Sequence, residues 1–273
     1  RGQDHAGLPK DAGQIDGSPL LYPQMGLYRI EWRDGVAKIS LNCGKANALD
    51  PQSLVAISRA LDEVGERGAR GVILTGYDRF FSSGLDLVTL YELDRPTMDA
   101  FIREFDRVML QVFAFPRPVV AAINGYAVAG GCILALACDA RLMPDHVGQI
   151  GLNEIRLGLP FPASALEIAR HCLPMEFVDA ILYGGQLYTP LEAMSRGLVD
   201  GLTPGDVMEE ARAVCRRLSE PPPAAFEAIK TSLKRPAIRR ANDTRDELRR
   251  AFVDAWFSAD GRRLVGEARA RLM

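Results

Sequence analysis

The sequence PVVAAINGYAVAGGCILALACDARLMPDHVGQIGLNE, residues Pro118 to Glu154, decides the fold. Residues 119–123 are a short apolar run of β-rich side chains, which favours a strand buried on both faces. Asn124-Gly125 predicts a turn. Residues 132–138 are rich in Ala, Leu and Cys, so they favour a helix, which Gly130-Gly131 opens. The stretch therefore predicts a buried strand, a turn and a buried helix.

The glycine pair Gly130-Gly131 also indicates a binding role. Without a Cβ, a ligand can approach the backbone closely, and the first N–H groups of a helix have no partner within the helix. Such a helix start can donate hydrogen bonds to developing negative charge. The alternative, that both glycines serve only tight helix packing, stays open at this point.

Two other interpretations of this stretch are less favoured. Residues 119–138 carry no charge and are long enough to span a membrane. Asn124, Gly125 and the glycine pair interrupt them, however, which favours the buried strand and helix. A Rossmann phosphate loop is disfavoured because the GxGxxG spacing is absent and the stretch lies in mid-chain.

The composition is that of an ordinary soluble globular chain, with 273 residues, 48% hydrophobic and 25% charged. The net charge of −2 gives no general attraction to nucleic acid or to an anionic membrane, so we expect neither as a partner. The five cysteines are odd in number and form no CxxC, which favours buried thiols in a reducing compartment and hence a cytoplasmic location.

Several catalytic signatures are missing from the sequence. HExxH, P-loop and EF-hand motifs are absent, so we predict no metal site and no nucleotide hydrolysis. There is no GxSxG, and the three histidines, His5, His146 and His171, show no partner pattern, which disfavours triad hydrolysis.

The chain is expected to have three parts. Residues 1–24 are rich in Gly, Pro and Asp and lack the apolar region of a secretory signal, so they are interpreted as a tail or disordered arm. Residues 25–204 form the α/β core, and residues 205–273 a helical C-terminal region that covers the core or makes an oligomer contact. The expected elements are a β-hairpin (27–32 and 36–41), helices at 50–64, 96–113, 163–172, 175–182, 190–197, 243–257 and 261–272, a strand at 71–76 and a Gly-containing loop at 80–87.

An ordered set of short motifs resembles the crotonase superfamily, the enoyl-CoA hydratase and isomerase group. The motifs are Asn47-Ala48-Leu49-Asp50, Phe81-Ser82-Ser83-Gly84-Leu85-Asp86, Ile123-Asn124-Gly125-Tyr126, Ala129-Gly130-Gly131-Cys132, Cys138-Asp139-Ala140-Arg141, Gly151-Leu152-Asn153-Glu154 and the run 193–200. The resemblance implies an α/β, crotonase-like (ClpP/crotonase) spiral of ββα units with a helical C-terminal region. It also implies a homotrimer or hexamer and an acyl-CoA or carrier-protein thioester substrate. Coenzyme A enters as part of that substrate, so no separate cofactor is expected.

The resemblance assigns an oxyanion hole to the backbone N–H groups of Ser83 and Gly130, which would hold the thioester carbonyl. Removing a proton α to a thioester builds an enolate, and each such donor is worth about 2.7–4 kcal/mol in oxyanion holes. By the same resemblance, the substrate-binding positions are Ala46, Ala48, Ser82, Gly84, Leu85, Asp86, Gly131, Ile133 and Leu157.

The acid and base residues suggest which reaction is catalysed. Hydratases of this family carry two glutamates, but the first position here is Ile133 and only the second, Glu154, is acidic. Adding water needs one group to activate the water and a proton for the α-carbon, which two carboxylates share. One carboxylate suffices to move a proton from C2 to C4 of a 3-enoyl thioester. The chain is therefore most similar to the monofunctional Δ3,Δ2-enoyl-CoA isomerases, and Ile133 is expected to dry the pocket and raise the pKa of Glu154.

Other functions remain open from the sequence. They are an enoyl-CoA hydratase-like lyase, an acyl-CoA hydrolase or decarboxylase of the same superfamily, and a non-catalytic acyl-CoA-binding protein. The basic residue that some members place after GxD for the CoA phosphates is missing near Val88. Lys45, Arg79, Lys230 and Arg262 are candidates to replace it.

Overall fold

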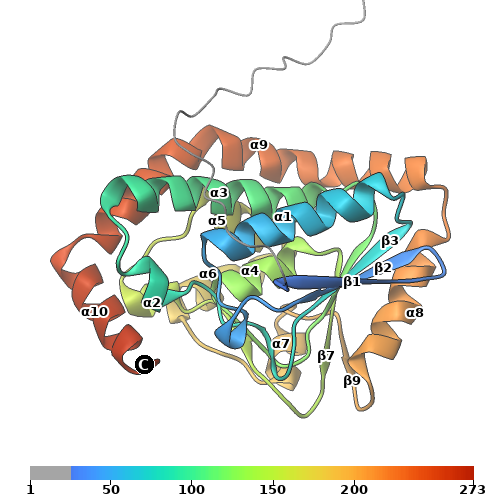
Figure 1. The fold of residues 1–273 in the computed structure, drawn as a ribbon, viewed down its shortest axis with the longest axis horizontal. Coiled ribbons are helices and arrows are strands. Elements are labelled where there is room, and N and C mark those ends of the chain that lie inside the picture. Colours follow the sequence, from blue (N-terminus) through green and yellow to red (C-terminus); the bar gives the residue numbers. More distant parts are fainter. Residues whose placement is uncertain (1–25) are drawn as a thin grey trace, which may run out of the picture.

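The computed structural model describes residues 26–273, so the predicted arm at 1–24 lies outside the described residues. The chain forms a six-stranded sheet of order β1-β2-β3-β5-β7-β9 and a three-stranded sheet of order β4-β6-β8 (Figure 1). β1 and β2 pair antiparallel, as the predicted hairpin requires, and the other pairs are parallel. The strands are β1 Tyr28–Arg33, β2 Val36–Leu41, β3 Gly71–Thr75, β4 Phe80–Ser82, β5 Val119–Ala122, β6 Tyr126–Val128, β7 Ala140–Pro144, β8 Ile150–Gly151 and β9 Gly201–Thr203.

Helices cover both faces of the six-stranded sheet. Alternate residues of a strand point to opposite faces, so Val72 and Leu74 of β3 join the larger core with α1 and α3, whereas Ile73 packs with α8 on the other face. The helices are α1 Pro51–Glu66, α2 Leu87–Leu90, α3 Arg95–Ala114, α4 Gly130–Ala137, α5 Ala163–Cys172, α6 Met175–Gly184, α7 Pro190–Ser195, α8 Val207–Ser219, α9 Pro223–Trp256 and α10 Ala259–Ala270, with 3-10 turns η1 Lys45–Asn47 and η2 Glu154–Leu157.

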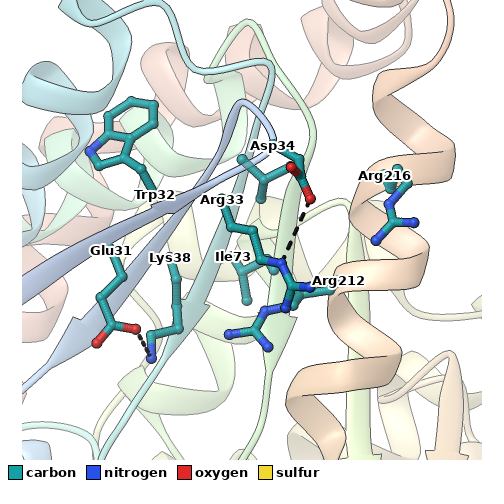
Figure 2. A pocket seen from close by; sticks show the side chains of 9 residues that line it. Glu31, Trp32, Arg33, Asp34, Lys38, Ile73, Arg212 and Arg216 are labelled. Atoms are coloured by element: carbon teal, nitrogen blue, oxygen red, sulfur yellow. Dashed lines mark ion pairs between the residues drawn. The ribbon is translucent and has the colours of Figure 1, made fainter.

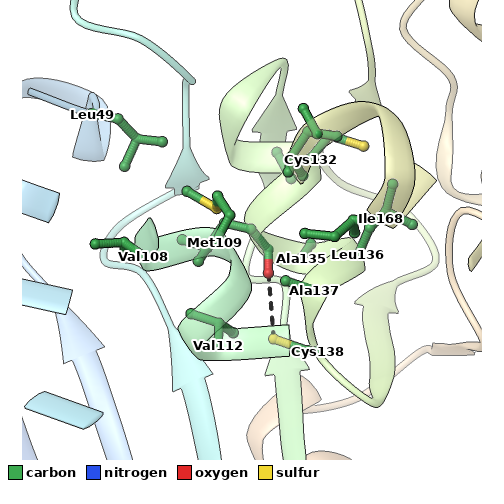
Figure 3. Close-up of a cluster of buried hydrophobic side chains, with 14 of the residues drawn as sticks. Leu49, Val108, Met109, Val112, Cys132, Ala135, Leu136, Ala137, Cys138 and Ile168 are labelled. Atoms are coloured by element: carbon green, nitrogen blue, oxygen red, sulfur yellow. Dashed lines mark hydrogen bonds between the residues drawn. The ribbon is translucent and has the colours of Figure 1, made fainter. Parts of the chain in front are cut away.

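The stretch from Pro118 to Glu154 forms the centre of the core. β5 is fully buried, and all eight residues of α4 are buried between α3 and α5 (Figure 3). Gly131 begins this helix against β4, where a Cβ would overlap the carbonyl oxygen of Ser82. The predicted buried strand and helix are confirmed, and Gly131 serves close packing. None of the helices within residues 26–273 is long and apolar enough to cross a membrane.

Local signals set the ends of the predicted helices. Asp50 caps α1, because its carboxylate accepts a hydrogen bond from the Ser53 N–H at 2.7 Å and the Ser53 hydroxyl accepts one from the Asp50 N–H. Pro51 fits the first helical position, where no N–H is needed. The predicted helix from Asp50-Pro51 is confirmed and ends at Glu66.

Two parts of the fold differ from the sequence prediction. The expected separate helix at 243–257 is the end of one continuous helix, α9, which begins at Pro223 and packs along α3 and α5. These contacts keep the helix continuous across Pro236 and the polar residues that follow, because tertiary packing outweighs local helix propensity. The strands β4, β6 and β8 were not predicted, and they build the candidate site.

Candidate active site

The three-stranded sheet brings the matched motifs to one edge. β6 pairs in parallel with β4, through Ser82 and Ala127, and with β8, through Val128 and Gly151. The segments that follow the carboxyl ends of parallel strands meet at the same sheet edge. Residues 83–86, 129–130 and 152–154 therefore lie together, although they are far apart in the sequence.

Close contacts confirm this arrangement. A Cβ built on Gly84 would lie 3.2 Å from the backbone nitrogen of Gly130, so the loop after β4 touches the start of α4. Burial raises the pKa of the Cys132 thiol, and the nearby charge of Glu154 raises it further. The Ala129 N–H, just before α4, donates to the Gly151 carbonyl at 2.8 Å, which brings the segment that leads to Glu154 beside the same helix start.

Glu154 is a buried acid without a charged partner. It begins η2, is 7% exposed, and its Oε2 is enclosed with no hydrogen-bond partner among the described residues. Burial raises its pKa to about 8, while a backbone hydrogen bond opposes the shift and no neighbouring charge contributes. The uncharged form is favoured because a carboxylate loses its hydration in such a site. A group with a pKa near neutrality suits proton transfer.

Gly130 offers one backbone donor at the start of α4. The first hydrogen bond within this helix runs from the Ile133 N–H to the Ala129 carbonyl at 3.0 Å, so the Gly130 N–H has no acceptor in the helix. Ala129 precedes it with φ 50°, a conformation that is strained for alanine. This backbone conformation sets the direction of the first turn of α4 and of its free N–H groups. It is consistent with the donor role that the resemblance implies.

The second donor requires a correction. The N–H of Ser83 is not free, because it donates to the Ala46 carbonyl at 3.0 Å. Leu85 forms a parallel bridge with Leu49. In this bridge the Leu49 N–H donates to the Gly84 carbonyl, and the Leu49 carbonyl accepts from the Asp86 N–H. The Leu85 N–H points away from that bridge and has no acceptor within the described chain. The Leu85 N–H is therefore free to donate, whereas that of Ser83 is not, and the Leu85 side chain lies beside Gly130.

The side chains of two predicted substrate-binding residues, Ser82 and Asp86, have structural partners. The Ser82 hydroxyl is buried, donates to the Asn47 carbonyl at 2.7 Å and accepts from the Gly84 N–H at 3.2 Å. The Asp86 carboxylate caps α2 by accepting from the N–H groups of Val88 and Thr89. These contacts shape the loop after β4. Ile133 and Gly131 are completely enclosed, and Ala46, Ala48 and Leu157 are half-buried beside the site, so their contact with substrate stays a prediction.

Asn47 is a positioning residue that the sequence analysis did not identify. Its side chain is buried, donates to the carbonyl groups of Leu41 and Phe81 at 3.2 and 3.3 Å, and accepts from the Cys43 N–H at 2.7 Å. It therefore fixes η1 to β4, the two segments that carry Ala46 and Ser83. The motif at 47–50 was recognised, but nothing in the motif shows which way this side chain points.

The last helix lies over the site. α10 packs on η2 and on α2, where Gly158 faces Leu264 and the Arg262 guanidinium lies 3.4 Å from the Tyr91 ring centroid (Figure 1). Lys45 donates to the Leu272 carbonyl at 2.8 Å. Of the basic candidates for the CoA phosphates, Lys45 and Arg262 border this region, whereas Lys230 lies elsewhere, bonded to Asp139.

Comparison with known proteins identifies the family of this chain. The family described as Enoyl-CoA hydratase/isomerase matches residues 31–269. A putative enoyl-CoA hydratase of Thermus thermophilus is 32% identical over 194 residues, which cover 69% of this chain and 76% of that protein. The mitochondrial enoyl-CoA delta isomerase 1 of Mus musculus is 32% identical over 204 residues, 73% of this chain and 71% of that protein.

A solved structure gives the same result for the fold. The crystal structure of the human mitochondrial delta3-delta2-enoyl-CoA isomerase superposes with a TM-score of 0.86 at 26% identity, covering 90% of this chain and 98% of that one. The predicted crotonase-like α/β fold with a helical C-terminal region is confirmed. The chain belongs to the enoyl-CoA hydratase/isomerase family of the crotonase superfamily.

Proposed function

We propose that this member of the family isomerises 3-enoyl-CoA to trans-2-enoyl-CoA, with Glu154 as the only proton shuttle. The observation that carries the proposal is the isolation of Glu154, which is buried, has no charged partner and has a pKa of about 8. The family relationship supplies the enoyl-CoA class of substrate, because relatives named as hydratases and as isomerases both match.

The proposed mechanism needs one base and two backbone donors. The Glu154 carboxylate takes a proton from C2 of the thioester, and the electrons move into the carbonyl to form a dienolate. The N–H groups of Leu85 and Gly130 hold the negative oxygen. The Glu154 carboxyl group then returns a proton to C4, the double bond ends between C2 and C3, and the carboxylate is restored. No water is consumed.

A census of the buried carboxylates supports a single base. Three of them are buried among residues 26–273: Asp106, Glu154 and Glu167. Asp106 accepts from the Ser164 N–H at 2.8 Å, and Glu167 pairs with Arg170 and Arg240. Of these three, only Glu154 has a fully enclosed oxygen without a hydrogen-bond partner. Ile133, where the resemblance would place a second glutamate, is apolar and enclosed, so water activation lacks its base.

Product analysis distinguishes the proposed isomerase from the alternatives. Purified enzyme is incubated separately with a 3-enoyl-CoA and a trans-2-enoyl-CoA, and the products are resolved by chromatography with mass detection. We expect an isobaric 2-enoyl product from the first and no water adduct from the second. A water adduct would favour the hydratase, free CoA the hydrolase, and loss of carbon dioxide from a carboxylated acyl-CoA the decarboxylase. Binding without turnover would leave the acyl-CoA-binding alternative.

We also propose that the chain assembles as a homotrimer or hexamer. Large apolar side chains of η2, α6 and α7 are exposed on the single chain, including Ile155, Met175, Tyr183 and Leu191. Clustered exposed apolar residues are typical of protein interfaces. Light scattering coupled to gel filtration measures the mass directly, and a monomer at micromolar concentration would contradict this assembly.

A further inference from the structure

A second cavity lies outside the candidate active site. It occupies about 420 Å³ between the end of α8, the first part of α9, the end of α5 and the turn from α4 to β7. Neither Glu154 nor any of the predicted oxyanion donors and substrate-binding positions lines it, although Lys230, one of the candidates for the CoA phosphates, does. Its volume falls in the range typical of small-molecule sites.

Three buried cations line this cavity against two carboxylates. Lys230, Lys234 and Arg141 are 5%, 7% and 6% exposed. Asp139 pairs with Lys230 at 2.6 Å and with Lys234 at 2.7 Å, and Asp200 pairs with Arg141 at 2.7 Å. Both oxygens of each carboxylate are engaged, because the Val119 and Arg141 backbone N–H groups bond them as well. One positive charge is therefore left without an opposite charge.

Donor groups of these cations also lack acceptors. The Arg141 Nε is buried and has no hydrogen-bond partner in the described part of the chain. An ammonium group has three protons. Lys230 donates one hydrogen bond to Asp139 and one to the Arg117 carbonyl. Lys234 donates one to Asp139 and one to the Phe113 carbonyl. The third proton of each ammonium has no oxygen acceptor among these residues.

Burial first, and neighbouring positive charge second, lower the pKa values of two groups that line this cavity. Burial lowers the pKa of Lys230 to about 8, and Lys234 lowers it further against the opposing pull of Asp139. Burial also lowers the pKa of His171 at the cavity wall, together with the charges of Lys234, Arg240 and Arg141. An environment that disfavours the positively charged forms of Lys230 and His171 attracts an anion.

The remaining wall of the cavity is apolar and open at its rim. Phe226 and Leu218 line it, and Ile229 and Leu233 stand one helical turn apart on α9 at 62% and 64% exposure. A ligand with an anionic head would therefore meet aliphatic and aromatic surface beyond the head.

A hollow elsewhere on the surface shows the contrast. Between the β1–β2 hairpin and α8, Lys38 pairs with Glu31 and Arg33 with Asp34, and Arg33 is largely exposed (Figure 2). Arg212 and Arg216 also line this hollow, and neither of them is buried. Of these two hollows, the cavity beside α9 is the one that combines buried cations, an unpaired buried donor and an apolar wall.

We propose that this cavity binds an aliphatic monocarboxylate, with its carboxylate on Lys230, Lys234 and Arg141 and its chain against Phe226, Ile229 and Leu233. One surplus positive charge matches a single negative charge. The apolar wall selects an alkyl chain over a compact inorganic anion. The site is separate from Glu154, so the proposal holds whatever reaction the enzyme catalyses.

Calorimetric titration with sodium octanoate tests the proposal on the full chain. We expect one site per chain, no binding of octylamine hydrochloride, and affinity at least tenfold weaker in Leu233→Asp, which puts a negative charge at the rim without disturbing the core. Val147→Asp is the control, since Val147 is exposed in the loop after β7, outside this cavity and apart from the apolar residues of the proposed subunit interface, and should leave binding unchanged.

Three results would overturn the proposal. The first is no octanoate binding, or equal binding to the wild type and Leu233→Asp. The second is displacement of octanoate by saturating octanoyl-CoA, which would put octanoate in the active site. The third is a change of subunit number in Leu233→Asp, measured by light scattering, which would show that another copy of the chain covers the rim.

Discussion

Glu154 and Asp139 are both acids enclosed by the protein, but their surroundings differ completely. Asp139 is held by two lysines and a backbone N–H. Glu154 has a buried oxygen with no partner, and its pKa is raised to about 8. The sequence places both in the matched motifs of one stretch, residues 118–154.

This difference distinguishes an acid that holds the structure together from an acid that is suited to proton transfer. A buried carboxylate with cations on both oxygens is stable as an ion and fixes the elements that carry its partners. One without partners favours its protonated form and gains and loses a proton near neutral pH. Burial alone therefore does not indicate catalysis, whereas burial without a partner does.

Replacing Glu154 should produce the largest effect on activity. Glu154→Gln keeps the shape and removes the base, so we expect isomerase kcat to fall by about 10²- to 10⁴-fold, the usual contribution of a general base. Steady-state assays with a 3-enoyl-CoA measure this loss. Glu167→Gln is the control, because Glu167 is equally buried but paired with Arg170 and Arg240. It should lower stability and leave kcat within a few fold.

Replacing Asp139 should affect stability instead. Asp139→Asn leaves the charges of Lys230 and Lys234 buried without a counter-ion, and breaking a buried pair costs about 3–5 kcal/mol. Urea unfolding should show this drop in the free energy of unfolding, while the folded fraction keeps its kcat. If Asp139→Asn were as stable as the wild type but inactive, the division between the two acids would be wrong.

The backbone donors allow a smaller and more local test. An ester in place of the amide at Leu85 removes one N–H, and the loss of one oxyanion donor costs about 10²- to 10³-fold in kcat. The same change at Ser83 removes only its bond to the Ala46 carbonyl and should act on stability. Semisynthetic proteins with each ester give both values. A larger kcat loss at Ser83 than at Leu85 would restore the original assignment.

The pH profile should show the raised pKa of Glu154. The base must be ionised, so kcat/KM should rise about tenfold per unit below pH 8 and level off above it. The effect on stability has the opposite direction. Because the pKa is 4.5 in the unfolded chain and about 8 when folded, the native state binds more protons between these values, and stability falls as the pH rises through that window. Glu154→Gln should lose both dependences, and a kcat/KM that is flat from pH 6 to 9 would contradict the raised pKa.

The sequence was sufficient to predict elements that carry a local turn or cap signal or a long hydrophobic pattern. The hairpin, the helix that begins at Asp50-Pro51 and the buried strand before Asn124 were predicted and are confirmed. β6 and β8 have three and two residues, too few to show a period of two, so the sheet that assembles the site could not be predicted.

The sequence predicted which residues form the site but not what surrounds them. The motif order pointed to Glu154 and Gly130, yet the missing partner of Glu154 depends on elements distant in the sequence. The direction of the Leu85 N–H depends on the bridge with Leu49, which no motif shows. Likewise, Lys230 and Lys234 lie about ninety residues beyond Asp139, so their ion pairs appear only in the folded chain.

Label transfer within the substrate tests the single-base mechanism most directly. A 3-enoyl-CoA carrying deuterium at C2 is converted by the enzyme in ordinary water, and mass spectrometry and NMR locate the label in the 2-enoyl product. If Glu154 carries the same proton from C2 to C4, a fraction of the product should hold deuterium at C4. A product with no deuterium at C4 at early conversion, or a 3-hydroxyacyl product instead, would contradict the account.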